Sequence, residues 1–166
     1  MIETAVQDLF IRQAQEEDVP LLLDFIKQLA DYEKLSHVVV ADAESLRRTL
    51  FGEIAFAEVI LADFQNQSVG FALFFHNYST FLGKPGIYLE DLFVVPAMRG
   101  KGIGRELLKY LARLTKERNC GRLEWSVLDW NKPAIEFYKN MGAVPMEQWT
   151  VFRLTGKALE RLSGSA

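Results

Sequence analysis

The sequence predicts an α/β (α+β) fold in which a mixed sheet has helices on both of its faces. The first observation is the order of the hydrophobic patterns, because segments with strand and helix periodicity follow one another as β-α-α-β-β-β-α-β-α-β. The second is the connections: three consecutive strands are joined without a helix, whereas helices separate the later ones. A chain of 166 residues suits one domain, which we expect to cover residues 1–166.

The composition is that of an ordinary soluble globular protein, with 49% hydrophobic and 25% charged residues. A net charge of −3 gives no electrostatic reason to expect nucleic acid or an anionic membrane as a partner. No apolar run approaches the ~20 residues of a transmembrane helix. The single cysteine, Cys120, cannot form a disulfide within the chain, which fits a cytoplasmic location.

The first strand candidate is residues 8–12. The following helix is expected to begin at Asp18, a good N-cap residue, with Pro20 in its first turn. Its apolar stripe consists of Leu22, Phe25, Ile26 and Leu29. A second, short helix is expected to begin after Asp42 and to end at Gly52.

The next two strand candidates, residues 58–62 and 69–75, enclose a polar turn and predict an antiparallel hairpin. Residues 77–86 contain two glycines and a proline, so we expect them to form a loop. The central strand is residues 87–95, and the proline that follows ends it.

After the central strand, an apolar face at helical spacing predicts a helix that begins near Ile103, with Gly121 as its C-cap. Residues 123–128 alternate as a strand does. Asn131 can cap a short helix, residues 149–154 form the last strand candidate, and residues 156–162 a short helical end.

The loop between the central strand and its helix has the composition of an anion site. It holds three glycines, at positions 100, 102 and 104, and three basic residues, Arg99, Lys101 and Arg105. Backbone N–H groups and partial positive charge at the N-terminus of a helix attract phosphate, and glycine lets the backbone approach it. A P-loop is excluded because Gly104 is not followed by Lys and Ser or Thr, and a dinucleotide fingerprint because residue 105 is Arg.

The pattern Arg-x-x-Gly-x-Gly after a strand that ends Leu-Phe-Val-Val resembles the acetyl-CoA loop of the GNAT N-acetyltransferases. The resemblance implies acetyl-CoA as co-substrate and a mostly antiparallel, twisted sheet with a V-shaped splay between the central strand and residues 123–128. It also implies that the backbone of Leu92, Phe93 and Val94 pairs with the pantetheine arm. The phosphates would be bound by the amides of Arg99, Gly100, Lys101, Gly102, Ile103 and Gly104.

A second motif, from Asn131 to Gly142, is similar to the Asn-x-x-Ala-x-x-Phe-Tyr-x-x-x-Gly segment of the same enzymes. The residues that it assigns to the cofactor are Asn131, Pro133, Ala134 and Tyr138. The similarity implies that Tyr138 is the general acid that protonates the leaving thiolate, because a phenol with the usual pKa of ~10 is protonated at neutral pH. The alternatives are that Asn131 only caps a helix and that Tyr138 forms a core aromatic pair with Phe137.

Glu90 and Asp91 form an acidic pair within the otherwise apolar central strand. Strand alternation points them to opposite faces, so only one lines a site directly. Because a buried carboxylate is costly without a partner or a role, we expect one to attract a cationic amine and to accept its proton. We favour Glu90 for this catalytic role; the alternative is a structural ion pair.

The stretch from Tyr88 to Val94, Tyr-Leu-Glu-Asp-Leu-Phe-Val, resembles the signature of the diamine acetyltransferases, the spermidine/spermine and thialysine enzymes. This closer resemblance implies a homodimer, and residues 69–75 with the following loop are candidates for its interface; the alternative is that these residues form the core of a monomer. The loop at 78–86 is similar to the thialysine branch, which favours a small or lysine-like primary amine over a long polyamine. The substrate residues that it implies are Tyr32, Glu33, Glu90, Asp91, Glu124, Trp125, Ser126 and Glu147.

Two other functions remain open for this sequence. One is acetylation of protein N-termini or lysines, and the other is a non-catalytic CoA-binding module. No metal is expected, because His37, His76 and Cys120 do not have the spacing of ligands.

Overall fold

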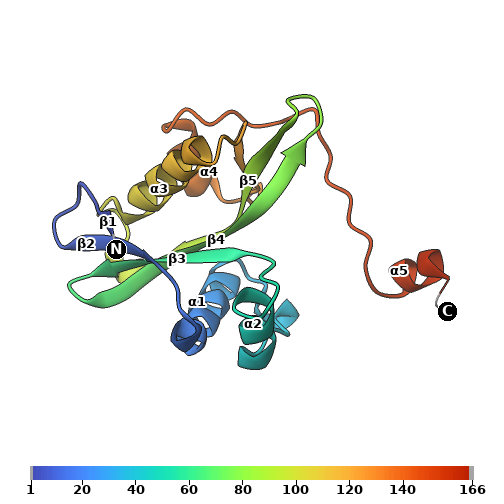
Figure 1. Cartoon of the computed structure of the whole chain (residues 1–166), viewed down its shortest axis with the longest axis horizontal. Helices are drawn as coiled ribbons and strands as arrows, with labels where there is room; N and C mark the ends of the chain where they lie inside the picture. Colours follow the sequence, from blue (N-terminus) through green and yellow to red (C-terminus); the bar gives the residue numbers. More distant parts are fainter. Residues whose placement is uncertain (1, 165–166) are drawn as a thin grey trace. The chain divides into compact units, whose positions relative to one another are not determined.

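A mixed sheet of six strands organises the first of two compact units in the computed structural model, which describes residues 2–164 (Figure 1). The strand order follows the sequence, and neighbouring strands are antiparallel except for the parallel pair β5–β6. The strands are β1 (Ile2–Glu3), β2 (Leu9–Gln13), β3 (Glu58–Phe64), β4 (Gln67–Ser79), β5 (Lys84–Val94) and β6 (Leu123–Trp125). The expected mixed, mostly antiparallel sheet is thus confirmed.

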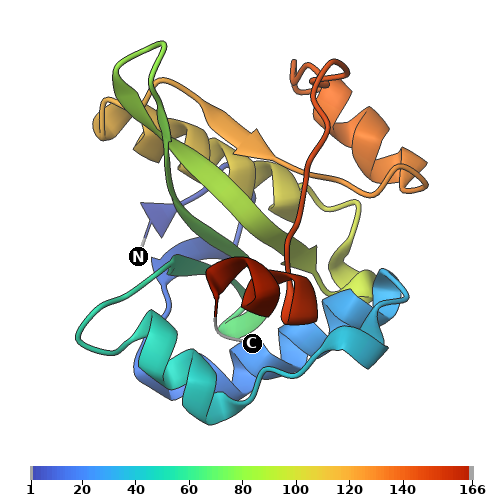
Figure 2. The ribbon, with the colours of Figure 1, turned by 90° about the vertical axis from the view of Figure 1, so that its right-hand side faces the viewer.

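Helices cover both faces of this sheet, as predicted (Figures 1 and 2). One face is covered by α1 (Val19–Tyr32) and α2 (Ala43–Leu50), and the other by α3 (Ile103–Glu117). Short 3₁₀ turns are η1 (Glu16–Asp18), η2 (Ser36–Val38) and η3 (Pro96–Met98). The first unit ends at Leu128, and the second contains α4 (Lys132–Lys139) and α5 (Gly156–Ser163). Within residues 2–164, no helix is long and apolar enough to cross a membrane.

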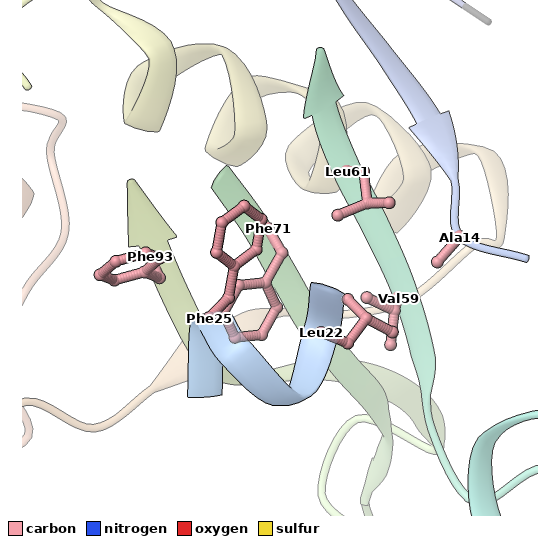
Figure 3. Packing of buried hydrophobic residues seen from close by; sticks show 7 residues of the cluster. All are labelled: Ala14, Leu22, Phe25, Val59, Leu61, Phe71 and Phe93. Carbon is pink, nitrogen blue, oxygen red and sulfur yellow. The ribbon is translucent and has the colours of Figure 1, made fainter. Parts of the chain in front are cut away.

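The core beneath α1 is built around three phenylalanines (Figure 3). Phe25 of α1 stacks on Phe71 of β4 with ring centroids 6.0 Å apart, and it lies 5.6 Å from the ring of Phe93 on β5. Burial of each such side chain contributes about 1.5–3 kcal/mol. The cluster therefore fixes α1 over the central strands, where β5 is about to end.

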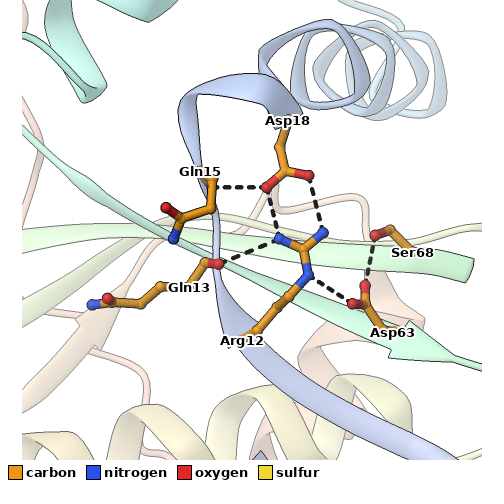
Figure 4. A network of polar contacts seen from close by, with 6 residues as sticks. All are labelled: Arg12, Gln13, Gln15, Asp18, Asp63 and Ser68. Carbon is orange, nitrogen blue, oxygen red and sulfur yellow. Dashed lines mark hydrogen bonds and ion pairs between the residues drawn. The ribbon is translucent and has the colours of Figure 1, made fainter. Parts of the chain in front are cut away.

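A polar network ties the start of α1 to the sheet (Figure 4). Arg12 of β2 donates to Asp18 at 2.7 and 2.9 Å and to Asp63 of β3 at 2.7 Å, while Ser68 donates to Asp63 at 2.6 Å. Asp18 also accepts from the N–H of Gln15. The prediction that its side chain caps α1 is therefore wrong, although Asp18 is the residue at the N-cap position. The Arg12 guanidinium lowers the pKa of Asp18, which makes this a structural ion-pair network.

The expected loop at residues 77–86 is wrong, because β4 continues to Ser79 and β5 already begins at Lys84. Only the tip turns, with Gly83 in a left-handed conformation at φ 61°. Gly86 is a strand residue opposite Asn77, and a Cβ there would lie 2.3 Å from the Asn77 side-chain oxygen. This glycine provides space for a neighbouring side chain, which composition alone does not distinguish from a loop signal.

Three further predictions, two about the ends of elements and one about a whole strand, are corrected. At the end of α3, Asn119 takes the left-handed position at φ 53°, and Gly121 instead packs against Leu82. The strand predicted over residues 123–128 ends at Trp125. Residues 149–154 form no strand, although their composition predicts one. By contrast, the cap of α2 is confirmed, since Asp42 accepts from the N–H of Ser45 at 2.7 Å.

Candidate active site

The loop between β5 and α3 has the backbone conformation that an anion site requires. Gly100 and Gly102 have φ values of 77° and 84°, which non-glycine residues rarely adopt. A Cβ at Gly100 would meet no atom within 4 Å, and one at Gly102 only Val6, at 3.4 Å. Gly102 is the N-cap of the 15-residue helix α3 and provides no side-chain cap. The first amides of α3 thus lie beneath an open, glycine-lined surface that fits a phosphate.

The basic side chains of this loop have partners within the protein. Arg99 donates from Nε to the carbonyl of Val94 at 3.0 Å, and its Cζ lies 4.4 Å from the ring centroid of Tyr32. Its Cζ is also 5.9 Å from the Phe93 ring. Arg99 therefore links the loop to the end of α1, a contact that the sequence analysis did not predict. Lys101 lies over the Phe64 ring, 5.7 Å from its centroid.

The parallel pairing between β5 and β6 is short. The parallel pairing joins Ile87 to Leu123 and Leu89 to Trp125 and then stops. Among the described strands, the stretch of β5 after Leu89 therefore pairs with β4 alone. An extended ligand can add itself to such a strand through backbone hydrogen bonds.

A β-bulge in β5 determines how the acidic pair is presented. Leu73 of β4 lies opposite Asp91 and Phe74 opposite Leu89, so Glu90 is the extra residue. The bulge leaves Glu90 exposed and places the half-buried Asp91 on the sheet face of Leu73, which packs against the α1 core. Sequence alternation predicted the opposite faces of the pair but not the bulge.

Asp91 lies in a negative environment at the end of α1. Burial, together with the charges of Glu90 and Glu33, raises its pKa to about 6. Burial also raises the pKa of Glu33, the residue that follows α1. The structure thus brings together three of the predicted substrate residues, and Tyr32 adjoins them through the chain. Such a group of neighbouring carboxylates can attract an ammonium and take up its proton.

Glu124 lies on the same sheet face as Asp91, but its carboxylate already has partners within the chain. Its Oε2 accepts from Asn77 Nδ2 at 2.8 Å and pairs with Arg122 Nε at 2.7 Å. Its register partner is Tyr88. Arg122 neutralises this carboxylate and Asn77 hydrogen-bonds to it, and no sequence signal pointed to either residue.

Trp125 and Ser126, at the end of β6, are associated with opposite faces of the sheet. Trp125 lies opposite Leu89, whose side chain belongs to the sheet face of α3, so the register does not bring Trp125 to Asp91. The Ser126 hydroxyl instead lies 2.8 Å from the Tyr88 hydroxyl. Ser126 is therefore linked to the sheet face on which Asp91 lies.

The second unit presents its own candidate residues. The N–H of Ala134 donates to the side-chain oxygen of Asn131 at 3.4 Å, so the predicted cap of α4 is confirmed, with Pro133 in the first turn. The rings of Phe137 and Tyr138 are 5.4 Å apart and tilted by 54°. Glu147 is exposed, in a stretch without helix or strand.

Comparison with known proteins gives one consistent family. The model of the acetyltransferase (GNAT) family matches residues 21–143. The chain is 41% identical to thialysine N-epsilon-acetyltransferase of Bos taurus, over 94% of this chain and 98% of that protein. It is 34% identical to L-ornithine N5-acetyltransferase NATA1 of Arabidopsis thaliana, over 92% and 86%. A solved integron cassette protein of V. cholerae, 28% identical, has a TM-score of 0.80 and covers 95% of this chain and 98% of its own.

Proposed function

The chain belongs to the acetyltransferase (GNAT) family and is an amine N-acetyltransferase that uses acetyl-CoA, and from this premise we propose that it acetylates a small primary amine of the thialysine, lysine or short-diamine type. The observation that supports this most is the half-buried carboxylate of Asp91 in the negative environment of Glu33 and Glu90. Such a group suits a substrate that arrives as a cation. The names of the thialysine and ornithine relatives point to the same class.

We assign different roles to the two carboxylates of the bulge. Asp91 is half-buried and faces the end of α1, so it binds the substrate ammonium. Glu90 is exposed at the bulge and passes the proton of the amine to solvent, through water. The sequence favoured Glu90 alone, and the bulge is the reason to involve both. Deprotonation is essential because an ammonium has no lone pair.

Acetyl-CoA is held by backbone in this proposal. The amides of residues 99–104 bind its phosphates at the start of α3, and the free side of β5 at residues 92–94 pairs with the pantetheine amides. The cap residue Asn131, with Pro133 and Ala134 of α4, provides further contacts to the arm.

The reaction is direct transfer within a ternary complex. The amine nitrogen attacks the thioester carbon, a C–N bond forms, and the N–H of Phe93 or Val94 stabilises the oxyanion. The C–S bond then breaks, and the hydroxyl of Tyr138 gives its proton to the sulfur. The half-buried position of Tyr138 beside Phe137 is compatible with this role and with a packing role, so the variant Tyr138→Phe is informative.

Long polyamines fit the chain less well than short amines do. The tip between β4 and β5 contributes exposed Phe81 and Leu82 but no carboxylate, and Lys84 there binds Asn119 at 3.0 Å. A second acidic group for a distant ammonium is therefore missing from residues 78–86. Of the other implied substrate residues, Tyr32 and Ser126 remain candidates, whereas the partners of Glu124 favour a structural role.

We also propose that the enzyme is a cytoplasmic homodimer. Cys120 is a free thiol, as expected in a reducing compartment. Within residues 69–75, Val69, Phe71 and Phe74 are buried in the chain's own core, which favours the core alternative for these three side chains.

The test is release of CoA thiol from acetyl-CoA with a panel of amines: thialysine, lysine, ornithine, short diamines, spermidine, spermine and an N-terminal peptide. Turnover with thialysine or a short diamine and little with spermine supports the proposal. Turnover with the peptide alone makes the protein a protein-modifying enzyme. A rate for Tyr138→Phe close to that of the wild type contradicts the assignment of the acid, since general acid catalysis contributes on the order of 10²-fold or more.

A further inference from the structure

A group of polar side chains lies on the same sheet face as Asp91, and no step of the reaction proposed above uses it. It consists of Asn77 of β4, Arg122, which directly precedes β6, and Glu124 of β6. Gly86 of β5 lies opposite Asn77 in the register of the sheet. All of these residues belong to the first unit of the chain.

The glycine in β5 makes room for this group. A Cβ at Gly86 would lie 2.3 Å from Oδ1 of Asn77 and 3.0 Å from Cγ of Arg122. The two side chains therefore occupy the space above the backbone of Gly86 that a larger residue would fill. This packing fixes the stem of Arg122 on the face on which Glu124 lies.

Arg122 and Glu124 each use one part of the charged head within the chain. Oε2 of Glu124 accepts from Nδ2 of Asn77 at 2.8 Å and pairs with Nε of Arg122 at 2.7 Å. Nη2 of Arg122 lies 3.5 Å from the carbonyl oxygen of Tyr78. Oε1 of Glu124 and Nη1 of Arg122 have no partner within residues 2–164. About a third of each side chain is exposed, so the pair is open to a small ligand.

A free guanidinium N–H beside a free carboxylate oxygen is complementary to the head of an α-amino acid at neutral pH. The α-carboxylate of the ligand accepts from the guanidinium, and the α-ammonium donates to Glu124. The second ammonium of a diamine meets a less favourable group, because Arg122 already compensates the charge of Glu124. The pair therefore suits a zwitterion better than a second cation.

The distance from this pair to Asp91 fits a substrate with a lysine-like side chain. Glu124 is level with Tyr88, which lies opposite Phe75. Asp91 lies opposite Leu73, so two residues of β4 separate the two levels. This corresponds to about 7 Å along the strand. In an extended lysine, Nε is about 6 Å from Cα, because each of the five bonds between them is about 1.5 Å long.

We propose that Arg122 binds the α-carboxylate of the substrate and makes the enzyme prefer α-amino acids with a terminal amine over the corresponding diamines. Glu124 keeps its structural role through Oε2, which orients Arg122, and contacts the α-ammonium through Oε1. The terminal amine of the same molecule is bound at Asp91. This inference rests on the proposed function and narrows its substrate class, since it separates lysine-like amino acids from diamines.

Matched substrates test the role of Arg122. Lysine and 1,5-diaminopentane differ only in the α-carboxylate, as do ornithine and 1,4-diaminobutane, and we expect the wild type to have the higher kcat/KM for the amino acid of each pair. Arg122→Gln should lower the ratio of kcat/KM for lysine to that for 1,5-diaminopentane at least about tenfold, the usual scale for a hydrogen bond to a charged group. It should raise kcat/KM for the diamine, because the charge of Glu124 is then uncompensated. Arg122→Lys keeps the charge without the planar fork and should restore part of the ratio.

The matched control is Arg113→Gln, which makes the same change of charge at an exposed residue of α3, on the other face of the sheet. We expect it to leave the ratio unchanged. A defect in folding or in acetyl-CoA binding lowers the rates with both substrates alike, so the ratio reports the contact to the carboxylate. Circular dichroism confirms that each variant is folded.

Norleucine provides a second measurement, because it has the α-amino acid head but no side-chain amine. We expect it to inhibit the acetylation of lysine competitively in the wild type and at least about tenfold more weakly in Arg122→Gln. A wild type that prefers the diamines, or an Arg122→Gln variant that loses kcat/KM equally for lysine and 1,5-diaminopentane, would overturn the role of Arg122 and leave the small-amine function in place. If the wild type acetylated none of the four amines, the proposed function itself would be wrong, and this inference with it.

Discussion

An ionised Asp91 suits the binding of an ammonium in our proposal, but the same negative charge destabilises the fold. Burial and two neighbouring carboxylates raise its pKa to about 6, so the native state binds a proton more tightly than the unfolded chain does. The free energy of unfolding therefore falls as pH rises from about 4 to 6 and stays low above that. We expect Asp91→Asn to raise the stability at pH 7 by on the order of 2 kcal/mol while it weakens amine binding. Thermal unfolding at pH 4 and 7 measures this, with the exposed Glu90→Gln as control; equal stability of Asp91→Asn and wild type at pH 7 would contradict it.

The same residue predicts the pH dependence of catalysis. If ionised Asp91 binds the ammonium, kcat/KM for the amine falls as pH drops through about 6. Because the charge of Glu33 contributes to the raised pKa of Asp91, Glu33→Gln should move this inflection to lower pH. A pH profile from 5 to 8 for both proteins gives the result. If the inflection stayed at the same pH in Glu33→Gln, it would not report the ionisation of Asp91.

Arg99 joins the loop that we propose to bind phosphate to Tyr32, a proposed substrate residue. Its guanidinium lies on the Tyr32 ring and is held by the carbonyl of Val94. We expect Arg99→Met to raise KM for the amine by roughly 3- to 10-fold, since a cation–π contact at a partly exposed site is worth about 0.5–2 kcal/mol. KM for acetyl-CoA should change little. Lys101→Met, in the same loop, should show the converse, and an Arg99→Met enzyme that loses only acetyl-CoA affinity would make Arg99 a phosphate ligand.

The loop before α3 can be tested against a hairpin with the same backbone strain. Gly100 and Gly83 both have left-handed backbones, and a Cβ at either would meet no atom within 4 Å. An alanine in this conformation costs about 1–2 kcal/mol, so Gly100→Ala and Gly83→Ala should lower stability by similar amounts. Only Gly100→Ala should raise KM for acetyl-CoA, by about tenfold, because only its loop adjoins the N-terminus of α3. If the two variants had similar KM values for acetyl-CoA, the proposal that this loop binds the phosphates would be wrong.

Sequence pattern predicted most elements because each depends on nearby residues. The hydrophobic spacing of α3, the cap Asp42 and the glycine turn at 100–102 are local signals, and all are confirmed. Features that depend on a neighbouring strand were missed. The bulge at Glu90 is visible only in the register with β4, and Gly86 is explained only by the side chain of Asn77 opposite it. The relative burial of the acidic pair also depends on this bulge, so alternation alone did not predict it.

For the whole molecule, the largest error of prediction lies at residues 149–154. Their composition predicts a strand, yet a strand also needs a partner, and the described chain gives them none. Composition reports that a segment can pair, but not whether the partner belongs to the same chain.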